Sequence, residues 1–192
     1  MKRSAVVMTV FGMLVGEAAL AQGGAKVLLD GKSLSAWDQV GDANWTIVEN
    51  AVQATAGKGG HLVSKERYAD FELTAEFWVE SPQTNSGIFI RCQDPSSISS
   101  KTCYEINIWD GRPEQDFATG GIVNVAKVIT PAKTAGRWGT IVITARGPKM
   151  SVTVNGTKTA EGENTQFASG AVTLQYGGPG TVRFRNVQIR PL

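Results

Sequence analysis

Histidine and cysteine are scarce in this sequence, which contains one histidine, His61, and two cysteines, Cys92 and Cys103. Two thiols without a nearby histidine make a poor metal site, because structural zinc sites combine several thiolate and imidazole ligands. The two cysteines lie close together in the chain, and such a pair in an exported protein is typical of a disulfide. We therefore expect a Cys92–Cys103 disulfide, with no thiolate metal centre and no reactive thiol.

Other absences narrow the class of protein. The formal net charge is only +2 and the basic residues are scattered, so the clustered basic face that nucleic-acid binding requires is missing. After residue 21 no segment is long and apolar enough to span a membrane. Sustained helical periodicity is also missing there, and we expect at most one helical turn, near Ser64–Tyr68. The sequence gives no indication of the oligomeric state.

The first 21 residues have the three parts of a secretory signal peptide. Lys2 and Arg3 form a basic start, residues 5–15 an apolar run, and residues 19–21 a small-residue cleavage site. An uncleaved membrane anchor is disfavoured, because Gly16 and Glu17 interrupt a run that is already too short to span a bilayer. We expect cleavage after Ala21, a single domain over residues 22–192, and a periplasmic or secreted location.

The rest of the sequence consists of short alternating runs separated by glycine, proline, asparagine and aspartate. Residues 71–79 alternate apolar and polar side chains, as a half-buried strand does. Residues 45–54 have the pattern of a hairpin, and so do residues 140–154, which an Asn-Gly turn follows. Many short strands at regular spacing predict an all-β domain, which we expect to be a jelly-roll β-sandwich of two antiparallel sheets. Trp45 and Trp138 are expected in its core.

The stretch from Asn85 to Asp110 carries the most chemistry. Two strand-like runs separated by a polar loop each have an apolar face, formed by isoleucines. The opposite faces carry a cation, an acid, an amide and aromatic rings, in the order Phe89, Arg91, Glu105, Asn107 and Trp109. This combination suits a small polar ligand with an apolar side, such as a sugar, although an ordinary half-exposed sheet has a similar pattern.

An ordered set of short phrases along the whole of residues 22–192 resembles one family. They are LLDGKSLSAW (28–37), WTIV (45–48), YADFEL (68–73), NSGIFIR (85–91), YEINI (104–108), TGGI (119–122), RW (137–138) and RFRNVQIRPL (183–192). The set is similar to the 3-keto-disaccharide hydrolase domain family. The resemblance implies a concanavalin-like β-sandwich, export, and action on glycosides that are oxidised at C3.

The chemistry implied by the resemblance is C2-proton abstraction, elimination of the C1 substituent, and addition of water. A ketone at C3 acidifies the C2 proton, so the site needs a base near C2, a cation near the enolate oxygen, and a proton donor for the leaving oxygen. Whether the overall reaction is that of a hydrolase or a lyase stays open. The resemblance also leaves open a divalent metal as the electrophile, and the sequence assigns no ligands to one.

Glu105 is the strongest candidate for the base, because it is the acid on the patterned strand and matches the Tyr-Glu position of the family phrase. Arg91 is a candidate for binding the keto or enolate oxygen, with a salt bridge to Glu105 as the structural alternative. If Cys92 and Cys103 were directly opposite, Arg91 would face Tyr104 and Glu105 would lie on the other face. We therefore expect an offset register that unites the two charged side chains.

The remaining candidates lie on loops and neighbouring strands. Asp110 is a candidate second acid or metal ligand, although an Asp-Gly pair is commonly just a turn. The family often has a histidine after this aspartate, and here Gly111-Arg112-Pro113 replaces it, which puts histidine or metal chemistry at this loop in doubt and makes Arg112 an alternative cation. Candidates for contacting the sugar share a polar or aromatic side chain near these strands: Asn85, Asn107, Trp109, Arg112, Gln175 and His61.

Three functions fit the sequence. The first is an exported enzyme that cleaves 3-keto-glycosides with a small carbohydrate as its substrate. The second is a non-catalytic, lectin-like carbohydrate-binding module, because a fold does not determine function. The third is a structural envelope protein without a ligand.

Overall fold

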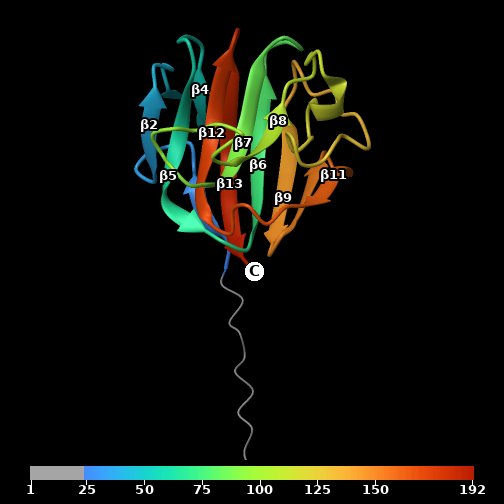
Figure 1. Cartoon of the computed structure of the whole chain (residues 1–192). Helices are drawn as coiled ribbons and strands as arrows, with labels where there is room; N and C mark the ends of the chain where they lie inside the picture. Colours follow the sequence, from blue (N-terminus) through green and yellow to red (C-terminus); the bar gives the residue numbers. More distant parts are fainter. Residues whose placement is uncertain (1–23) are drawn as a thin grey trace, which may run out of the picture.

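The computed structural model describes residues 24–192, and the predicted signal peptide lies outside the described residues. Within residues 24–192, thirteen strands form two antiparallel sheets that pack face to face, as predicted (Figure 1). The only helix in this range is a single 3-10 turn, Gln115–Phe117. No helix in the described residues is long and apolar enough to cross a membrane.

The larger sheet has the strand order β11-β10-β9-β6-β13-β4-β3, with β1 paired to β13. Its strands are β1 (Lys26–Leu29), β3 (Thr46–Val48), β4 (Ala51–Ala54), β6 (Phe71–Val79), β9 (Gly139–Arg146), β10 (Lys149–Val154), β11 (Thr157–Glu163) and β13 (Val182–Pro191). Both predicted hairpins are confirmed, because β3 pairs with β4 and β9 pairs with β10.

The smaller sheet has the order β2-β5-β12-β7-β8. Its strands are β2 (Trp37–Gly41), β5 (Gly60–Tyr68), β7 (Asn85–Cys92), β8 (Tyr104–Ile108) and β12 (Gly170–Gly178). The expected helical turn near Ser64–Tyr68 is wrong, because these residues complete the nine-residue strand β5.

The core lies between the two sheets and follows the alternation of the sequence. In β6, every second residue from Phe71 to Val79 is buried, and the residues between them are half-buried. The isoleucines of β7 and β8 close the core from the other side. Trp45 is in this core, as predicted. The prediction for Trp138 is wrong, because its ring packs against the guanidinium of Arg185, with 4.0 Å between the ring centre and Cζ.

A second, smaller apolar cluster lies on the outer side of the smaller sheet. It contains Val63, Phe89, Ala171 and the two cysteines, which form the predicted disulfide. Ile98, from the loop between the cysteines, packs against this cluster. The loop, yellow-green in Figure 1, therefore covers part of the outer face and leaves a polar part beside it.

Candidate functional site

A row of predicted site residues crosses four strands on the outer face of the smaller sheet. Gln175 of β12 pairs with His61 of β5 on one side and with Gly87 of β7 on the other. Gly87 in turn pairs with Asn107 of β8. Directly paired residues in antiparallel strands share a face, so the register brings His61, Gln175 and Asn107 into one line.

Gly87 keeps the middle of this row open. A Cβ atom at this position would lie 3.3 Å from Gln175 Oε1 and 3.4 Å from Phe89 Cε2. Both side chains therefore lean over the glycine, and a larger residue would displace them. Asn85, two residues earlier in β7, is half-buried and stands on the same face, at the start of the strand.

The next row contains Thr173, Phe89 and Glu105. The ring of His61 meets Phe89 edge-on at 5.2 Å, and its Nδ1 lies 3.2 Å from Thr173 Oγ1. Burial lowers the pKa of His61 to about 4, so the imidazole is neutral near pH 7. Neutral His61 is suited to hydrogen bonding rather than to charge stabilisation.

Glu105 is half-buried on this face. Burial raises the pKa of its carboxyl group, and the charge of Arg112 acts in the opposite direction. Among residues 24–192, no side chain or backbone amide donates a hydrogen bond to its carboxylate. A carboxylate with a raised pKa and free lone pairs has the properties of a general base.

Trp109 and Arg112 line a pocket directly after β8. The pocket has a volume of about 280 Å³ and is completed by Pro113 and Glu114. The Arg112 guanidinium lies 5.9 Å from the centre of the Trp109 ring and 3.0 Å from Glu114 Oε2. The pocket therefore combines an aromatic surface with a fixed cation whose field reaches Glu105.

Unpartnered polar atoms are concentrated at these residues. Five buried side-chain nitrogen or oxygen atoms of the described chain have no hydrogen-bond partner, and four belong to predicted site residues. They are Asn107 Oδ1, Trp109 Nε1, Arg112 Nε and Gln175 Oε1. Because an unpaired buried polar group costs free energy, such a cluster indicates a place where a ligand or water completes the hydrogen bonds.

Asp110 does not reach this face. Its carboxylate is buried and accepts hydrogen bonds from the hydroxyls of Thr119 and Thr134 and from the backbone amides of Thr134 and Ala135. Its oxygens are thus already engaged in joining the loops around residues 119 and 134. The expectation that Asp110 offers an acid or a metal ligand is not supported, because this network leaves it no free access to a ligand.

The expected register offset between β7 and β8 is present, since Phe89 is opposite Glu105 and Ile90 is opposite Tyr104. Arg91 nevertheless leaves the face of Glu105. It has a positive φ of 53°, and β7 carries one extra residue relative to β12 between Phe89 and Cys92. Such a bulge re-aims the side chain that it contains.

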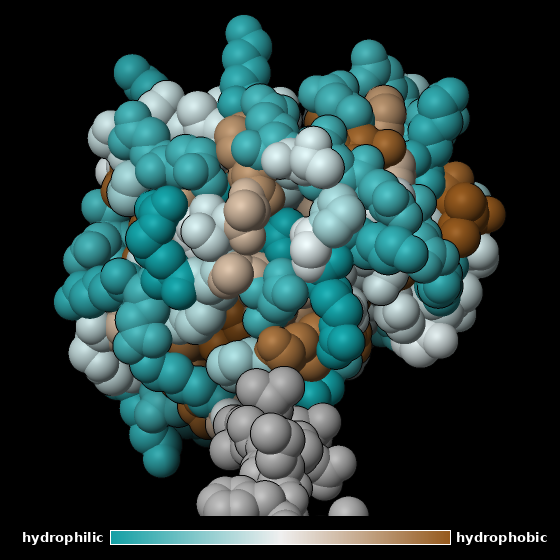
Figure 2. Space-filling model, turned by 60° about the horizontal axis from the view of Figure 1, so that its bottom comes forward, coloured by the Kyte–Doolittle hydropathy of each residue, from teal (hydrophilic) through white to brown (hydrophobic). Residues whose placement is uncertain are grey.

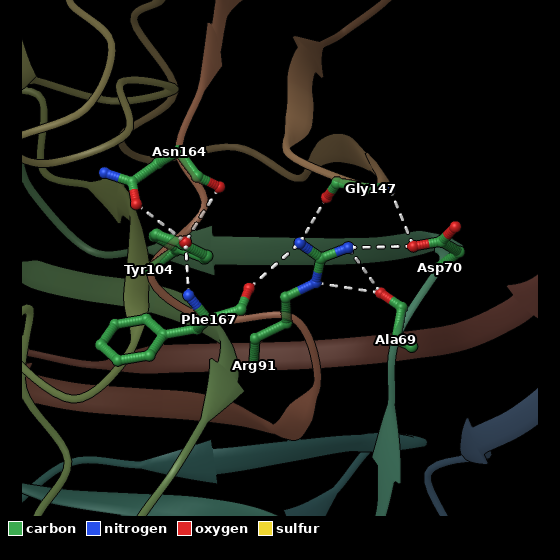
Figure 3. Close-up of polar contacts among 7 residues, drawn as sticks. All are labelled: Ala69, Asp70, Arg91, Tyr104, Gly147, Asn164 and Phe167. Atoms are coloured by element: carbon green, nitrogen blue, oxygen red, sulfur yellow. Dashed lines mark hydrogen bonds and ion pairs between the residues drawn. The ribbon is translucent and has the colours of Figure 1, made fainter.

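The Arg91 side chain is fully buried at the end of the sandwich (Figure 3). Its guanidinium donates hydrogen bonds to the carbonyl oxygens of Ala69, Gly147 and Phe167 and to Oδ1 of Asp70. All its donors are used, so the expected pairing with Glu105 or with a keto oxygen is corrected to a structural role.

The sequence reasoning missed Thr173, which holds His61. Thr173 precedes Gln175 by two residues in β12, so strand alternation alone places both on one face. The donors around Asp110 left no such signal, because Thr119 and Thr134 belong to irregular loops.

The site residues do not fit a metal ion. In the part of the chain that the structure describes, no group of three or more histidine, cysteine, aspartate or glutamate side chains could hold one. Glu105 stands on the outer face, whereas the Asp110 carboxylate is enclosed by its four donors. The two acids expected at this site therefore cannot share a metal ion.

Comparison with known proteins agrees with this architecture. The family model of the 3-keto-alpha-glucoside-1,2-lyase-like domain, which is the family that the sequence resembles, matches residues 24–190. No curated protein matches the chain.

Solved structures share the fold. A protein from Parabacteroides distasonis described as a proposed glycosyl hydrolase is 17% identical, with a TM-score of 0.76 over 88% of this chain and 94% of its own. A second such protein from the same organism is 22% identical, with a TM-score of 0.72 over 88% of this chain and 100% of its own. A family 66 carbohydrate-binding module from Bacillus subtilis is 15% identical, with a TM-score of 0.62 over 81% and 95% of the two chains. At these identities the likeness shows the fold alone.

Proposed function

This chain belongs to the 3-keto-alpha-glucoside-1,2-lyase-like domain family, and from that premise we propose that it is an exported enzyme that cleaves 3-keto-glycosides. The observation that supports a site on the smaller sheet is the cluster of four unpartnered buried polar atoms beside the free carboxylate of Glu105. A structural envelope protein has no need of such a cluster.

In the proposed reaction, Glu105 removes the proton from C2, and the electrons of the C–H bond form an enolate with its charge on the C3 oxygen. The enolate then re-forms the ketone, the bond between C1 and the glycosidic oxygen breaks, and the leaving oxygen takes up a proton from the solvent, to which Glu105 in turn releases the proton from C2. Water adds across the resulting C1–C2 double bond, with the hydroxyl at C1 and the proton at C2. The sum of these steps is hydrolysis, whereas release before the addition of water is a lyase reaction.

The remaining side chains have matching roles in this proposal. Arg112 takes the place expected for Arg91, because it carries the charge that acts on Glu105 and has a buried, unpartnered Nε. Preorganised cations and donors of this kind stabilise a developing oxyanion. Trp109 offers a stacking surface, and the half-buried Gln175 has a free Oε1 that accepts a hydrogen bond from a sugar hydroxyl. Asn107 is fully buried and donates to the carbonyl oxygen of Phe117, so it supports the row and does not touch the sugar.

The test is the release of 4-nitrophenol from a 3-keto-glucoside by residues 22–192, with and without chelator and beside the unoxidised glucoside. The wild type should cleave only the keto form. Glu105→Gln should lower the rate by about 10²–10⁴-fold while binding survives, as expected for loss of a general base. Glu72→Gln is the matched control, because Glu72 pairs with Arg190 on the outer face of the larger sheet.

Two outcomes would replace the proposal. Full activity in the Glu105→Gln variant would remove Glu105 from the chemistry. Saturable sugar binding without any cleavage by the wild type would favour the lectin-like module, which needs the Trp109 pocket and the amides but no base.

A further inference from the structure

A second pocket lies at the end of the sandwich where the C-terminus is found. It has a volume of about 390 Å³ and is formed by the β5–β6 turn, the β9–β10 turn and the β11–β12 loop. Figure 2 looks at this end of the molecule, where hydrophilic side chains surround smaller hydrophobic patches. None of its lining residues belongs to the pocket at Trp109, so the proposed reaction does not use it.

The buried side chain of Arg91 stabilises the walls of this pocket. Its guanidinium joins all three chain segments, through Ala69 and Asp70 of the first turn, Gly147 of the second, and Phe167 of the loop. The distances run from 2.7 Å for Gly147 O to 3.2 Å for Phe167 O. The pocket is therefore preorganised rather than formed by mobile loop tips.

Tyr104 fixes the loop wall from a second direction (Figure 3). Its hydroxyl donates toward Asn164, 3.1 Å from the carbonyl oxygen and 3.0 Å from Oδ1, and accepts the backbone N–H of Phe167 at 2.8 Å. The rings of Tyr104 and Phe167 are also in contact, with 5.1 Å between their centres. The orientation of the Phe167 ring is thus fixed while the residue stays half-buried in the pocket wall.

The polar groups of the pocket suit a neutral ligand with hydroxyl groups. Oδ1 of Asp70 accepts hydrogen bonds from Arg91 and from the amide of Gly147, and the side chain is still 41% exposed. The Arg91 cation balances the Asp70 anion. Asn164 uses its Oδ1 for Tyr104 and Gln166, which leaves its NH₂ group without a partner among residues 24–192.

From these contacts we propose that this pocket is a second, non-catalytic binding site for a neutral pyranose. The apolar C–H face of the sugar packs on Phe167, and its hydroxyls accept from the NH₂ group of Asn164, while Asp70 lies at the other end of the pocket, beyond Arg91 (Figure 3). An aromatic ring next to an amide matches the mixed apolar and hydroxyl surface of a pyranose. Two sugar sites on one chain would raise its affinity for a glycan that reaches both.

The test is an NMR titration of ¹⁵N-labelled residues 22–192 with methyl α-D-glucopyranoside, which is not oxidised at C3. Saturable shifts are expected at the amides of Gly147, Thr165 and Ala168. They should persist in Glu105→Gln and Trp109→Leu, which alter the other site.

Phe167→Leu is the decisive variant, because leucine keeps an apolar contact with Tyr104 but removes the flat ring. It should weaken the binding measured at these amides by about tenfold, in line with the loss of an aromatic contact. Its cleavage of the keto substrate should be unchanged, so this proposal and the proposed function fail separately. Absence of saturable shifts at these amides, or equal affinity in Phe167→Leu with a native-like spectrum, would overturn the second site.

Discussion

At the scale of single residues, Arg112 and Glu105 form a pair whose coupling can be measured. Burial raises the pKa of Glu105 and Arg112 lowers it, and a base must be ionised to work. Activity on the keto substrate is therefore expected to fall as the pH drops through this raised pKa.

Removal of the Arg112 charge should shift that profile. In Arg112→Gln the lowering influence is lost, so the pKa of Glu105 rises further and the acid limb of kcat/KM moves to higher pH. Arg185→Gln, which changes an arginine beside Trp138 and Glu76 on the larger sheet, is the control and should leave the limb in place. If the acid limb of kcat/KM stays at the same pH in Arg112→Gln, Arg112 does not influence the pKa of the base.

Arg91 supports a prediction on stability. Replacement by methionine leaves the carbonyls of Ala69, Gly147 and Phe167 without their donor in a buried place. We expect a loss of about 3–5 kcal/mol in the free energy of unfolding, the range for breaking a buried charged network. Urea unfolding checks this, with Arg190→Met as the control, because its partly exposed pair with Glu72 should contribute at most about 1 kcal/mol.

Arg91 shows what a sequence pattern can and cannot predict at the scale of single residues. Period-two alternation placed Glu105, Asn107 and Gln175 on one outer face, because regular strands obey it. Arg91 obeyed the same pattern in the sequence, but a positive φ inside a bulge turned it away. The signal for that bulge lies in the neighbouring strand: a Cβ on Gly170 would lie 2.2 Å from the carbonyl carbon of Arg91.

At the scale of elements, alternation and turn residues predicted β6, the two hairpins and the two-sheet architecture. The strand β5 was only partly recognisable, because residues 65–67 are consecutive charged residues that remain exposed. Its pairing with β12, in which Ala171 lies opposite Arg67, decides the structure there, and such long-range pairing is not encoded in a local pattern. The loops that Asp110 joins were beyond prediction for the same reason.

The disulfide loop is the element with the clearest energetic prediction. Cys92 and Cys103 close a short loop and are buried with Phe89, Val63 and Ala171. The Cys92→Ala/Cys103→Ala double variant should lose about 3 kcal/mol in the free energy of unfolding, since the unfolded chain regains the entropy of the open loop. Urea midpoints of the two proteins measure it. Thiol titration of the denatured, non-reduced wild type should find no free thiol, and two free thiols would contradict the disulfide.

At the scale of the whole molecule, His61 links stability to pH. Burial lowers its pKa in the folded protein to about 4, below the ordinary value of 6.5. The unfolded chain therefore binds a proton at a pH where the folded chain does not, and stability falls as the pH drops from about 6.5 toward 4. The raised pKa of Glu105 acts in the opposite sense, so the comparison must isolate His61.

The measurement is the free energy of unfolding of wild type and His61→Gln at pH 7 and pH 5. The variant should lose less stability than the wild type between the two values, because glutamine takes up no proton. Parallel losses would mean that His61 titrates normally in the folded protein.

The contacts of Arg91 have a consequence for redesign. Apart from Asp70, its partners are main-chain carbonyls, and a carbonyl is present whatever the side chain is. The hydrogen bonds by which Arg91 joins three chain segments are therefore compatible with many turn sequences. Randomising Thr165, Gln166 and Ala168, which are exposed, would change the surface at this end of the sandwich. It would leave the hydrogen bonds of Arg91 to the main chain intact. The domain can in this sense serve as a scaffold, because these exposed residues can be changed while the hydrogen bonds of Arg91 keep the three turns together.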